Sequence, residues 1–245
     1  MGKKQIVFFG SSPFSVLVLE KLVLSAKCQV LSVVTTPDKP VGRHLKLTPN
    51  PVKVLAQKYN LPVYDKIHDF IMTTNDYSMT IGLVAAYGRI IGPKTLSKLN
   101  NQIYGIHPSL LPKYRGPSPL QQQILDGITE TGVTIFKTDL GEDTGPIVAV
   151  AHDKVLPNDT TITLGNRLFE KGTELFIEIQ DSRFKIQKQN HSGATYTKKL
   201  TRQDGFVDYQ LITNNHELEK KRRAFFPWPG VWTINPQGKR IKLDL

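Results

Sequence analysis

Two turns of this sequence hold side chains that could move a proton between reacting groups. In residues 107–119, His107 follows a short apolar run, and four prolines restrict the backbone. Imidazole titrates near neutral pH, so a histidine in a stiff loop suits general-base catalysis. In residues 139–145, Asp143 lies between two glycines and could approach the imidazole, fix its tautomer and stabilise its protonated form. Spacing alone also allows a structural histidine and a carboxylate that only caps a strand.

The elements around these turns alternate between strands and helices. Apolar runs predict strands at residues 5–9, 29–35, 79–86, 102–106, 131–138 and 146–154, and helical spacing predicts helices at 14–22, 51–58, 93–99, 119–126 and 160–179. This order is typical of a Rossmann-like α/β fold, an open, mostly parallel sheet with helices on both faces. Ligands bind beyond the carboxyl ends of such strands, so we expect both turns to converge at one sheet edge.

The pattern changes to polar, basic sequence beyond about residue 190. We expect a catalytic domain at residues 1–190, a linker at 191–203 and a small, truncated C-terminal domain, a β-barrel-like remnant, at 204–245. A helix is expected at 215–224 and short strands at 231–235 and 240–243.

Composition narrows the class of protein. There are 32 Lys and Arg against 21 Asp and Glu, a net charge of +11, which favours encounter with polyanions such as nucleic acid. Cys28 is the only cysteine, which excludes an internal disulfide and a Cys-based metal site. The first residues have neither a signal-peptide core nor a membrane span. We therefore expect a soluble cytoplasmic protein, monomeric and without a membrane partner.

Several motifs together resemble the folate-dependent formyltransferases. They comprise the two turns, Thr131-Gly132-Val133-Thr134-Ile135, and residues 36–43, 84–88 and 223–229. Their arrangement is more similar to the methionyl-tRNA branch of that family than to the glycinamide ribonucleotide branch. The resemblance covers almost the whole chain.

The resemblance implies a reaction and a set of site residues. A formyl group would pass from 10-formyltetrahydrofolate, a reduced folate, to the α-amine of initiator methionyl-tRNA, for translation initiation in the cytoplasm or in an organelle or bacterial-type compartment. No metal is implied. His107 would accept or relay the proton and Asp143 would orient it. The implied folate-binding residues are Leu83, Ala85, Tyr87, Gly88, Ser109, Leu110, Leu111, Pro112, Leu140, Gly141, Glu142 and Asp143.

One departure from the family concerns catalysis. The family has an asparagine two residues before the histidine, whose amide donates to the formyl oxygen, and this chain has Gly105. Loss of one such donor costs about 100- to 1000-fold in rate. A slow enzyme, an enzyme with a replacement donor, and a folate- or tRNA-binding homologue without turnover all fit.

The loop at residues 36–50 is the implied tRNA contact. It holds Lys39, Arg43, His44 and Lys46 with Asp38 as its single acid, and in the resembled family it enters the acceptor-stem region. Basic side chains there would bind phosphates in a salt-dependent way. The alternative is an amino-sugar-nucleotide formyltransferase, which would share the proposed catalytic pair. It would not need this loop or the net charge of +11, and this weighs against it.

Overall fold

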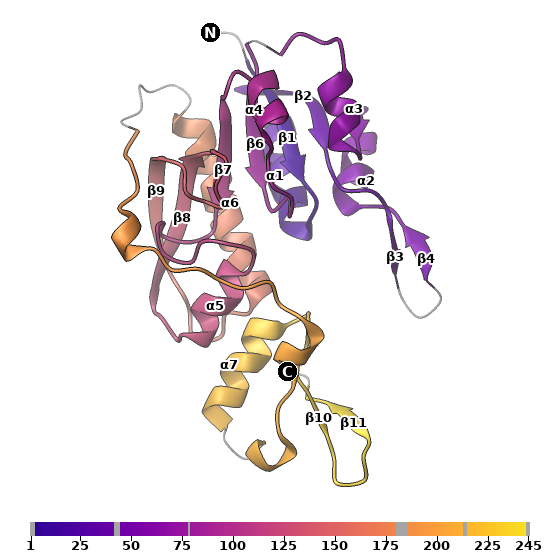
Figure 1. Ribbon diagram of the computed structural model, residues 1–245, viewed down its shortest axis with the longest axis vertical. Helices are drawn as coiled ribbons and strands as arrows, with labels where there is room; N and C mark the ends of the chain where they lie inside the picture. Colours follow the sequence, from indigo (N-terminus) through magenta and orange to yellow (C-terminus); the bar gives the residue numbers. More distant parts are fainter. Residues whose placement is uncertain (1–2, 42–44, 78, 180–185, 213–214, 244–245) are drawn as a thin grey trace.

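The computed structural model describes residues 3–41, 45–77, 79–179, 186–212 and 215–243. Within them a seven-stranded sheet has the order β5-β2-β1-β6-β7-β8-β9 (Figure 1). The first five run parallel, whereas β8 is antiparallel to both β7 and β9. The predicted open, mostly parallel sheet is confirmed. Its strands are β1 (Lys4–Gly10), β2 (Cys28–Val34), β5 (Val63–Tyr64), β6 (Ile81–Ala85), β7 (Ile103–His107), β8 (Glu130–Lys137) and β9 (Ile147–Lys154).

Strand β1 shows why the sheet needs helices on both faces. Ile6 and Phe8 belong to one buried cluster, while Val7 and Phe9 belong to another on the opposite face. A strand that is apolar on both sides must be covered on both sides. The first face is covered by α1 (Pro13–Leu24), α2 (Pro51–Lys58) and α6 (Thr161–Ile179), and the second by α3 (Ile67–Met72) and α4 (Pro93–Lys98).

The start of α1 is fixed to the carboxyl end of β6. Ser12 caps the helix in a reciprocal capping box with Ser15, and Pro13 takes the first helical position, where its missing N–H is not needed. The buried hydroxyl of Ser15 donates to the carbonyl of Ala85 at 2.7 Å. The turns that follow β1 and β6 are therefore held together at this edge of the sheet.

The basic loop forms a hairpin that projects from the same edge. Its strands are β3 (Lys39–Val41) and β4 (Lys46–Thr48), which pair antiparallel (Figure 1). At its base, Asp38 accepts hydrogen bonds from Nζ of Lys53 at 3.0 Å and from the amide of Asn50 at 3.2 Å. The Lys53 hydrogen bond, followed by that of Asn50, lowers the pKa of Asp38. The acid thus anchors the hairpin.

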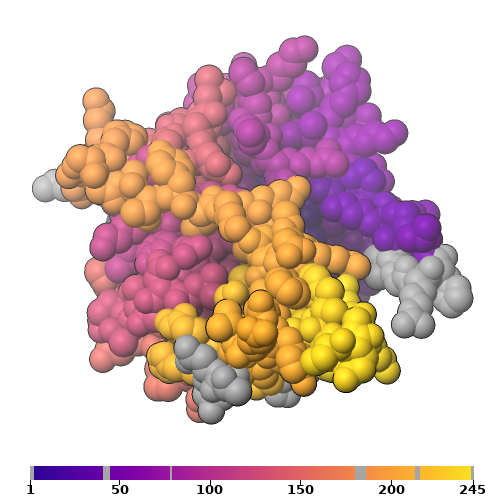
Figure 2. Space-filling view, turned by 60° about the horizontal axis from the view of Figure 1, so that its bottom comes forward, coloured from indigo at the N-terminus to yellow at the C-terminus, as the bar shows by residue number. Residues whose placement is uncertain are grey.

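The C-terminal residues pack on the sheet domain through α5 (Pro119–Leu125) and α6. They comprise α7 (Asn215–Phe225) and a two-stranded antiparallel sheet of β10 (Trp232–Ile234) and β11 (Arg240–Lys242). Leu218 and Phe225 lie in the same buried cluster as Leu120 of α5. Figure 2 looks onto this end, where the segment after α6 (orange) leads to the C-terminal residues (yellow).

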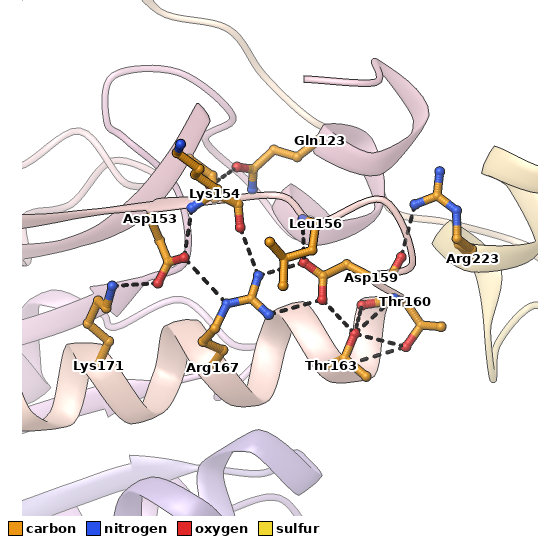
Figure 3. A network of polar contacts seen from close by, with 11 residues as sticks. Gln123, Asp153, Lys154, Leu156, Asp159, Thr160, Thr163, Arg167, Lys171 and Arg223 are labelled. Atoms are coloured by element: carbon orange, nitrogen blue, oxygen red, sulfur yellow. Dashed lines mark hydrogen bonds and ion pairs between the residues drawn. The ribbon is translucent and has the colours of Figure 1, made fainter. Parts of the chain in front are cut away.

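An ion-pair network beside this junction links β9, α6 and α7 (Figure 3). Arg167 of α6 contacts Asp159 at 2.5 Å and Asp153 at 3.4 Å, and Lys171 contacts Asp153 at 2.5 Å. Arg223 of α7 donates to the main-chain carbonyl of Asp159 at 3.0 Å. Asp159, just before α6, thereby contacts α6 through its side chain and α7 through its main-chain carbonyl.

None of the helices in the described ranges is both long enough and apolar enough to cross a membrane.

Candidate active site

A cavity of about 470 Å³ lies beside the ends of β6 and β7. This volume is in the range of small-molecule binding sites. Its wall includes Ser12, Val84, Ala86, Tyr87, Gly88, Arg89, Ile91, Gly105, His107, Gly116, Gln121, Phe136, Thr138, Asp139, Gly141, Glu142 and Asp143. The sequence-predicted catalytic residues therefore share one cavity.

His107 is the last residue of β7 and is almost completely buried. Its Nε2 lies 2.8 Å from the carbonyl oxygen of Tyr114. A carbonyl can only accept, so Nε2 carries the hydrogen and Nδ1 remains for proton transfer. We expected Asp143 to fix the tautomer, and the structure corrects this, because the main-chain carbonyl of Tyr114 does so.

Asp143 faces the free nitrogen of that ring. Its Oδ2 lies 3.4 Å from Nδ1 of His107 and accepts the amide of Gly116 at 2.8 Å. Asp143 has a φ of +53° and Tyr114 a φ of +60°, in the left-handed region that costs non-glycine residues about 1–3 kcal/mol. Both turns are thus held in unfavourable backbone conformations where they meet.

This geometry suits a shared proton. An unprotonated Nδ1 and a carboxylate are both acceptors, so their close approach is favourable when one proton lies between them. The pair can then accept a proton from one reacting group and return it to another, which is general acid–base catalysis.

The two turns meet by a different route from the one we expected. Because β8 is antiparallel to β7, Lys137 lies opposite Tyr104, and the amide of Thr138 donates to the carbonyl of Ile103 at 2.8 Å. The turn at 139–145 therefore begins beside the amino end of β7. It folds back along the sheet to bring Asp143 to His107.

Gly105 faces the ring of Phe136, its partner across β7 and β8. A Cβ atom at position 105 would lie 2.4 Å from Cε1 of that ring, closer than real Cβ atoms approach. The ring is also edge-on to the imidazole of His107, with centroids 6.4 Å apart. At this point the wall is aromatic and offers no side-chain hydrogen-bond donor from position 105.

The sequence-predicted folate residues divide into two groups. Those that line the cavity are Tyr87, Gly88, Gly141, Glu142 and Asp143. Those that do not line it are Leu83, Ala85, Ser109, Leu110, Leu111, Pro112 and Leu140. Leu83 and Ala85 are core residues of β6, and Leu140 is largely exposed.

Residues 109–112 brace the histidine loop from behind. The hydroxyl of Ser109 donates to the carbonyl of Lys113 at 2.7 Å, and the amide of Leu111 donates to Thr134 of β8 at 3.2 Å. These residues do not form the cavity surface, and they affect its shape only by holding His107 in position.

Beside the hairpin predicted to bind tRNA lies a second cavity of about 450 Å³. Lys39 lines it, together with Arg89, which also belongs to the first cavity. Lys46 is exposed on the facing strand of the hairpin. Arg43 and His44 lie outside the described residues.

Sequence reasoning missed Phe136, Arg115 and Gln189. Phe136 reads as an ordinary apolar strand residue, and only the β7–β8 register places it opposite Gly105. Arg115 and Gln189 are 74 residues apart yet hydrogen-bonded. The sequence around Gln189 gives no sign of this contact. For Arg115 the only sign is that it lies in the predicted histidine loop.

The family model and the curated relatives that match this chain are all formyltransferases. The model of the formyl transferase family matches residues 3–179. The chain is 40% identical over 238 residues to the methionyl-tRNA formyltransferase of Chloroflexus aggregans, covering 94% of this chain and 76% of the relative. It is 36% identical over 243 residues to that of Thermus thermophilus, covering 97% and 78%.

Solved structures resemble the fold. A 4-N formyltransferase from Francisella tularensis matches with a TM-score of 0.73 at 19% identity, covering 99% of this chain and 97% of that one. An N-formyltransferase from Helicobacter canadensis, in complex with folinic acid and dTDP-3-aminofucose, matches with a TM-score of 0.63 at 20% identity, covering 91% and 81%. At these identities the likeness establishes the architecture alone.

Proposed function

Because the chain belongs to the methionyl-tRNA formyltransferase family, we propose that it transfers the formyl group of 10-formyltetrahydrofolate to the α-amine of methionyl-tRNA. The observation that carries the mechanism is the contact of 3.4 Å between His107 and Asp143 in the wall of a ligand-sized cavity. Together they supply the proton transfers that such a reaction requires.

The reaction balances with one proton moved. The amine nitrogen attacks the formyl carbon and forms a C–N bond, and the bond between that carbon and N10 of the folate breaks. The proton lost by the amine ends on N10. The pair of His107 and Asp143 takes the proton from the attacking nitrogen and returns it to the leaving one, with Nδ1 as the exchanging ring atom because Nε2 is tied to Tyr114.

The cavity wall offers a folate both apolar and polar surface. Val84, Ile91 and Phe136 give apolar surface for a flat ring. Gln121 and Glu142 belong to the same wall and carry groups that can hydrogen-bond to the polar edges of such a ring.

The exposed lysines of the hairpin support tRNA as the carrier of the acceptor amine. Lys39 lines the second cavity, Lys46 is exposed on the other strand of the hairpin, and the acid of this loop, Asp38, is already paired with Lys53. The hairpin thus presents positive charge next to the site, as contacts to phosphates require.

Position 105 favours a second candidate, a homologue that binds folate without efficient turnover. The ring of Phe136 fills the space in which a donating side chain would lie. In the proposed enzyme this hydrogen bond to the developing oxyanion is not supplied from position 105, which slows the reaction but leaves the proton transfers of His107 and Asp143 in place. Binding of reduced folate without formylation of methionyl-tRNA would select the second candidate.

An amino-sugar-nucleotide formyltransferase remains the third candidate, because the Helicobacter enzyme, solved with folinic acid and dTDP-3-aminofucose, matches 91% of the chain. The 40% identity to a methionyl-tRNA formyltransferase weighs against it. The experiment is a direct comparison of formyl transfer from 10-formyltetrahydrofolate to methionyl-tRNA and to amino-sugar nucleotides. We expect product with methionyl-tRNA, and product with the sugar alone would overturn the proposal.

A further inference from the structure

The segment that follows α6 runs along both catalytic turns. Gln187 exchanges two backbone hydrogen bonds with Ile147, of 2.7 and 2.8 Å. Further along, the amide of Arg115 donates to the carbonyl of Thr195 at 2.9 Å, and the amide of Thr197 donates to the carbonyl of Arg115 at 2.7 Å. Residues of the expected linker are therefore attached to the loop of His107, and Gln187, just before the linker, is attached to the start of β9, which follows the turn that holds Asp143.

Between these attachments, the side chain of Gln189 bridges the two turns. It is 5% exposed. Its Nε2 donates to the carbonyl of Asp143 at 2.8 Å and to the carbonyl of Gly145 at 2.6 Å. Its Oε1 accepts from Nη2 of Arg115 at 2.6 Å and from Nε at 3.2 Å. Both donor hydrogens and the acceptor of the amide are in use.

Arg115 holds the other end of this bridge and is completely buried. Its guanidinium also donates to the hydroxyl of Tyr196 at 2.8 Å and contacts Nδ1 of His191 at 3.1 Å. It directly follows Tyr114, whose carbonyl fixes the ring of His107. The chain of contacts thus runs from the backbone of Asp143, through Gln189 and Arg115, to the loop of His107.

We infer that Gln189 is a positioning residue, which keeps the carboxylate of Asp143 within reach of Nδ1 of His107. Asp143 has a φ of +53°, so its turn must be held by its surroundings. Gln189 holds the carbonyl of Asp143 itself and the carbonyl two residues later. The other charged side chains of the cavity wall are Arg89, Asp139 and Glu142.

The role of Gln189 in catalysis rests on the proposed function, whereas its effect on the geometry can be measured without turnover. Gln189→Met removes the two hydrogen-bond donors and the acceptor while keeping a side chain of similar length. Gln189→Glu removes the donors, but its carboxylate still accepts hydrogen bonds from Arg115. A loss of function in this variant therefore cannot be caused by Arg115 losing its partner. Thr161→Val is the matched control, because it deletes a buried hydrogen bond of 2.5 Å to the carbonyl of Ala224, at the α6–α7 junction.

The first measurement is the ¹⁵N chemical shift of the His107 imidazole in the full chain, which reports the hydrogen bonds of each ring nitrogen. We expect the chemical shift of Nδ1 to differ from that of the parent protein in Gln189→Met and in Gln189→Glu, and to be unchanged in Thr161→Val. An unchanged Nδ1 resonance in both Gln189 variants would overturn the inference, whatever the activity of the parent protein.

The second measurement is steady-state formyl transfer. For both Gln189 variants we expect kcat to fall about 10- to 100-fold, the cost of a small misplacement, with KM for methionyl-tRNA little changed. A Gln189→Glu protein that keeps the parent's kcat would show that the residue acts only through Arg115 and would overturn the inference. A parent protein without formyl transfer counts against the proposed function, and the ¹⁵N comparison still decides on the positioning role.

Discussion

The ring of Phe136 occupies the space into which a side chain at Gly105 would extend. The two residues are paired across β7 and β8, and a Cβ atom on Gly105 would lie 2.4 Å from the ring. The ring is buried beside His107, so it cannot leave this place without entering the cavity or disturbing the imidazole. Positions 105 and 136 therefore have to be considered together.

A first prediction concerns this pair. Gly105→Asn alone should destabilise the fold by about 1–3 kcal/mol through overpacking, without a gain in rate. Gly105→Asn combined with Phe136→Ala opens the space for the amide. Since a whole oxyanion donor is worth about 100- to 1000-fold, we expect the double variant to exceed Phe136→Ala in kcat by about tenfold or more.

Urea unfolding and steady-state formylation measure the two effects. A single Gly105→Asn protein that is faster than the parent would show that the ring does not exclude a side chain. A double variant no faster than Phe136→Ala would show that another group already supplies the hydrogen bond.

A second prediction concerns the hairpin. Lys39 and Lys46 are exposed on its two strands. If each contacts a phosphate, replacing either by Ala should weaken tRNA binding and reduce the slope of log K against log salt by about 0.7–0.9. Lys58 at the far end of α2 is the control, since it is also exposed but lies away from the hairpin. Equal salt slopes for all three variants would contradict a phosphate contact at the hairpin.

A third prediction concerns stability in acid. Burial would raise the pKa of Asp159, but hydrogen bonds, chiefly from Arg167, outweigh it, so the pKa lies below the ordinary value of 3.8. For Asp153, burial is likewise outweighed, chiefly by Lys171. A carboxyl whose pKa is lowered by folding stabilises the native state above its unfolded pKa, and this stability is lost as the pH falls through the folded pKa.

The variant Arg167→Ala tests the direction of this pH dependence of stability. At pH 7 we expect a loss of about 3 kcal/mol of unfolding free energy, because Asp159 would be left buried with its charge uncompensated. The difference from the parent should shrink as the pH falls below about 4 toward the lowered folded pKa, because the carboxyls of the parent then become protonated and lose their ion pairs. Urea unfolding between pH 3 and pH 7 measures both curves, and a difference that grows toward acid would contradict the assignment.

The main elements were predictable from the sequence because their signals are local. The helix predicted at 51–58 is α2 with the same bounds, and the long helix predicted from about 160 to 179 is α6. The hairpin β3–β4, the two-residue strand β5 and the short helix α3 were not predicted. They span two to six residues each, which is too short for a periodic pattern to stand out.

The site was predictable in its residues but not in its contacts. The chemistry of His107 and Asp143 follows from their residue types, and the resemblance supplied their pairing. The tautomer depends on a main-chain carbonyl, that of Tyr114, which a sequence does not reveal. The support from Gln189 depends on a contact across 46 residues. Alternation of apolar residues is the same for either strand direction, so the antiparallel course of β8 was also hidden.

The most direct test of the central claim compares the parent protein with Asp143→Asn, which keeps the shape of the side chain but removes its charge. Formyl transfer from 10-formyltetrahydrofolate to methionyl-tRNA is measured beside the affinity for reduced folate. We predict transfer by the parent, a loss of about 100- to 10,000-fold in kcat in the variant, and folate affinity that is little changed. Transfer at the parent's rate by Asp143→Asn would contradict the account.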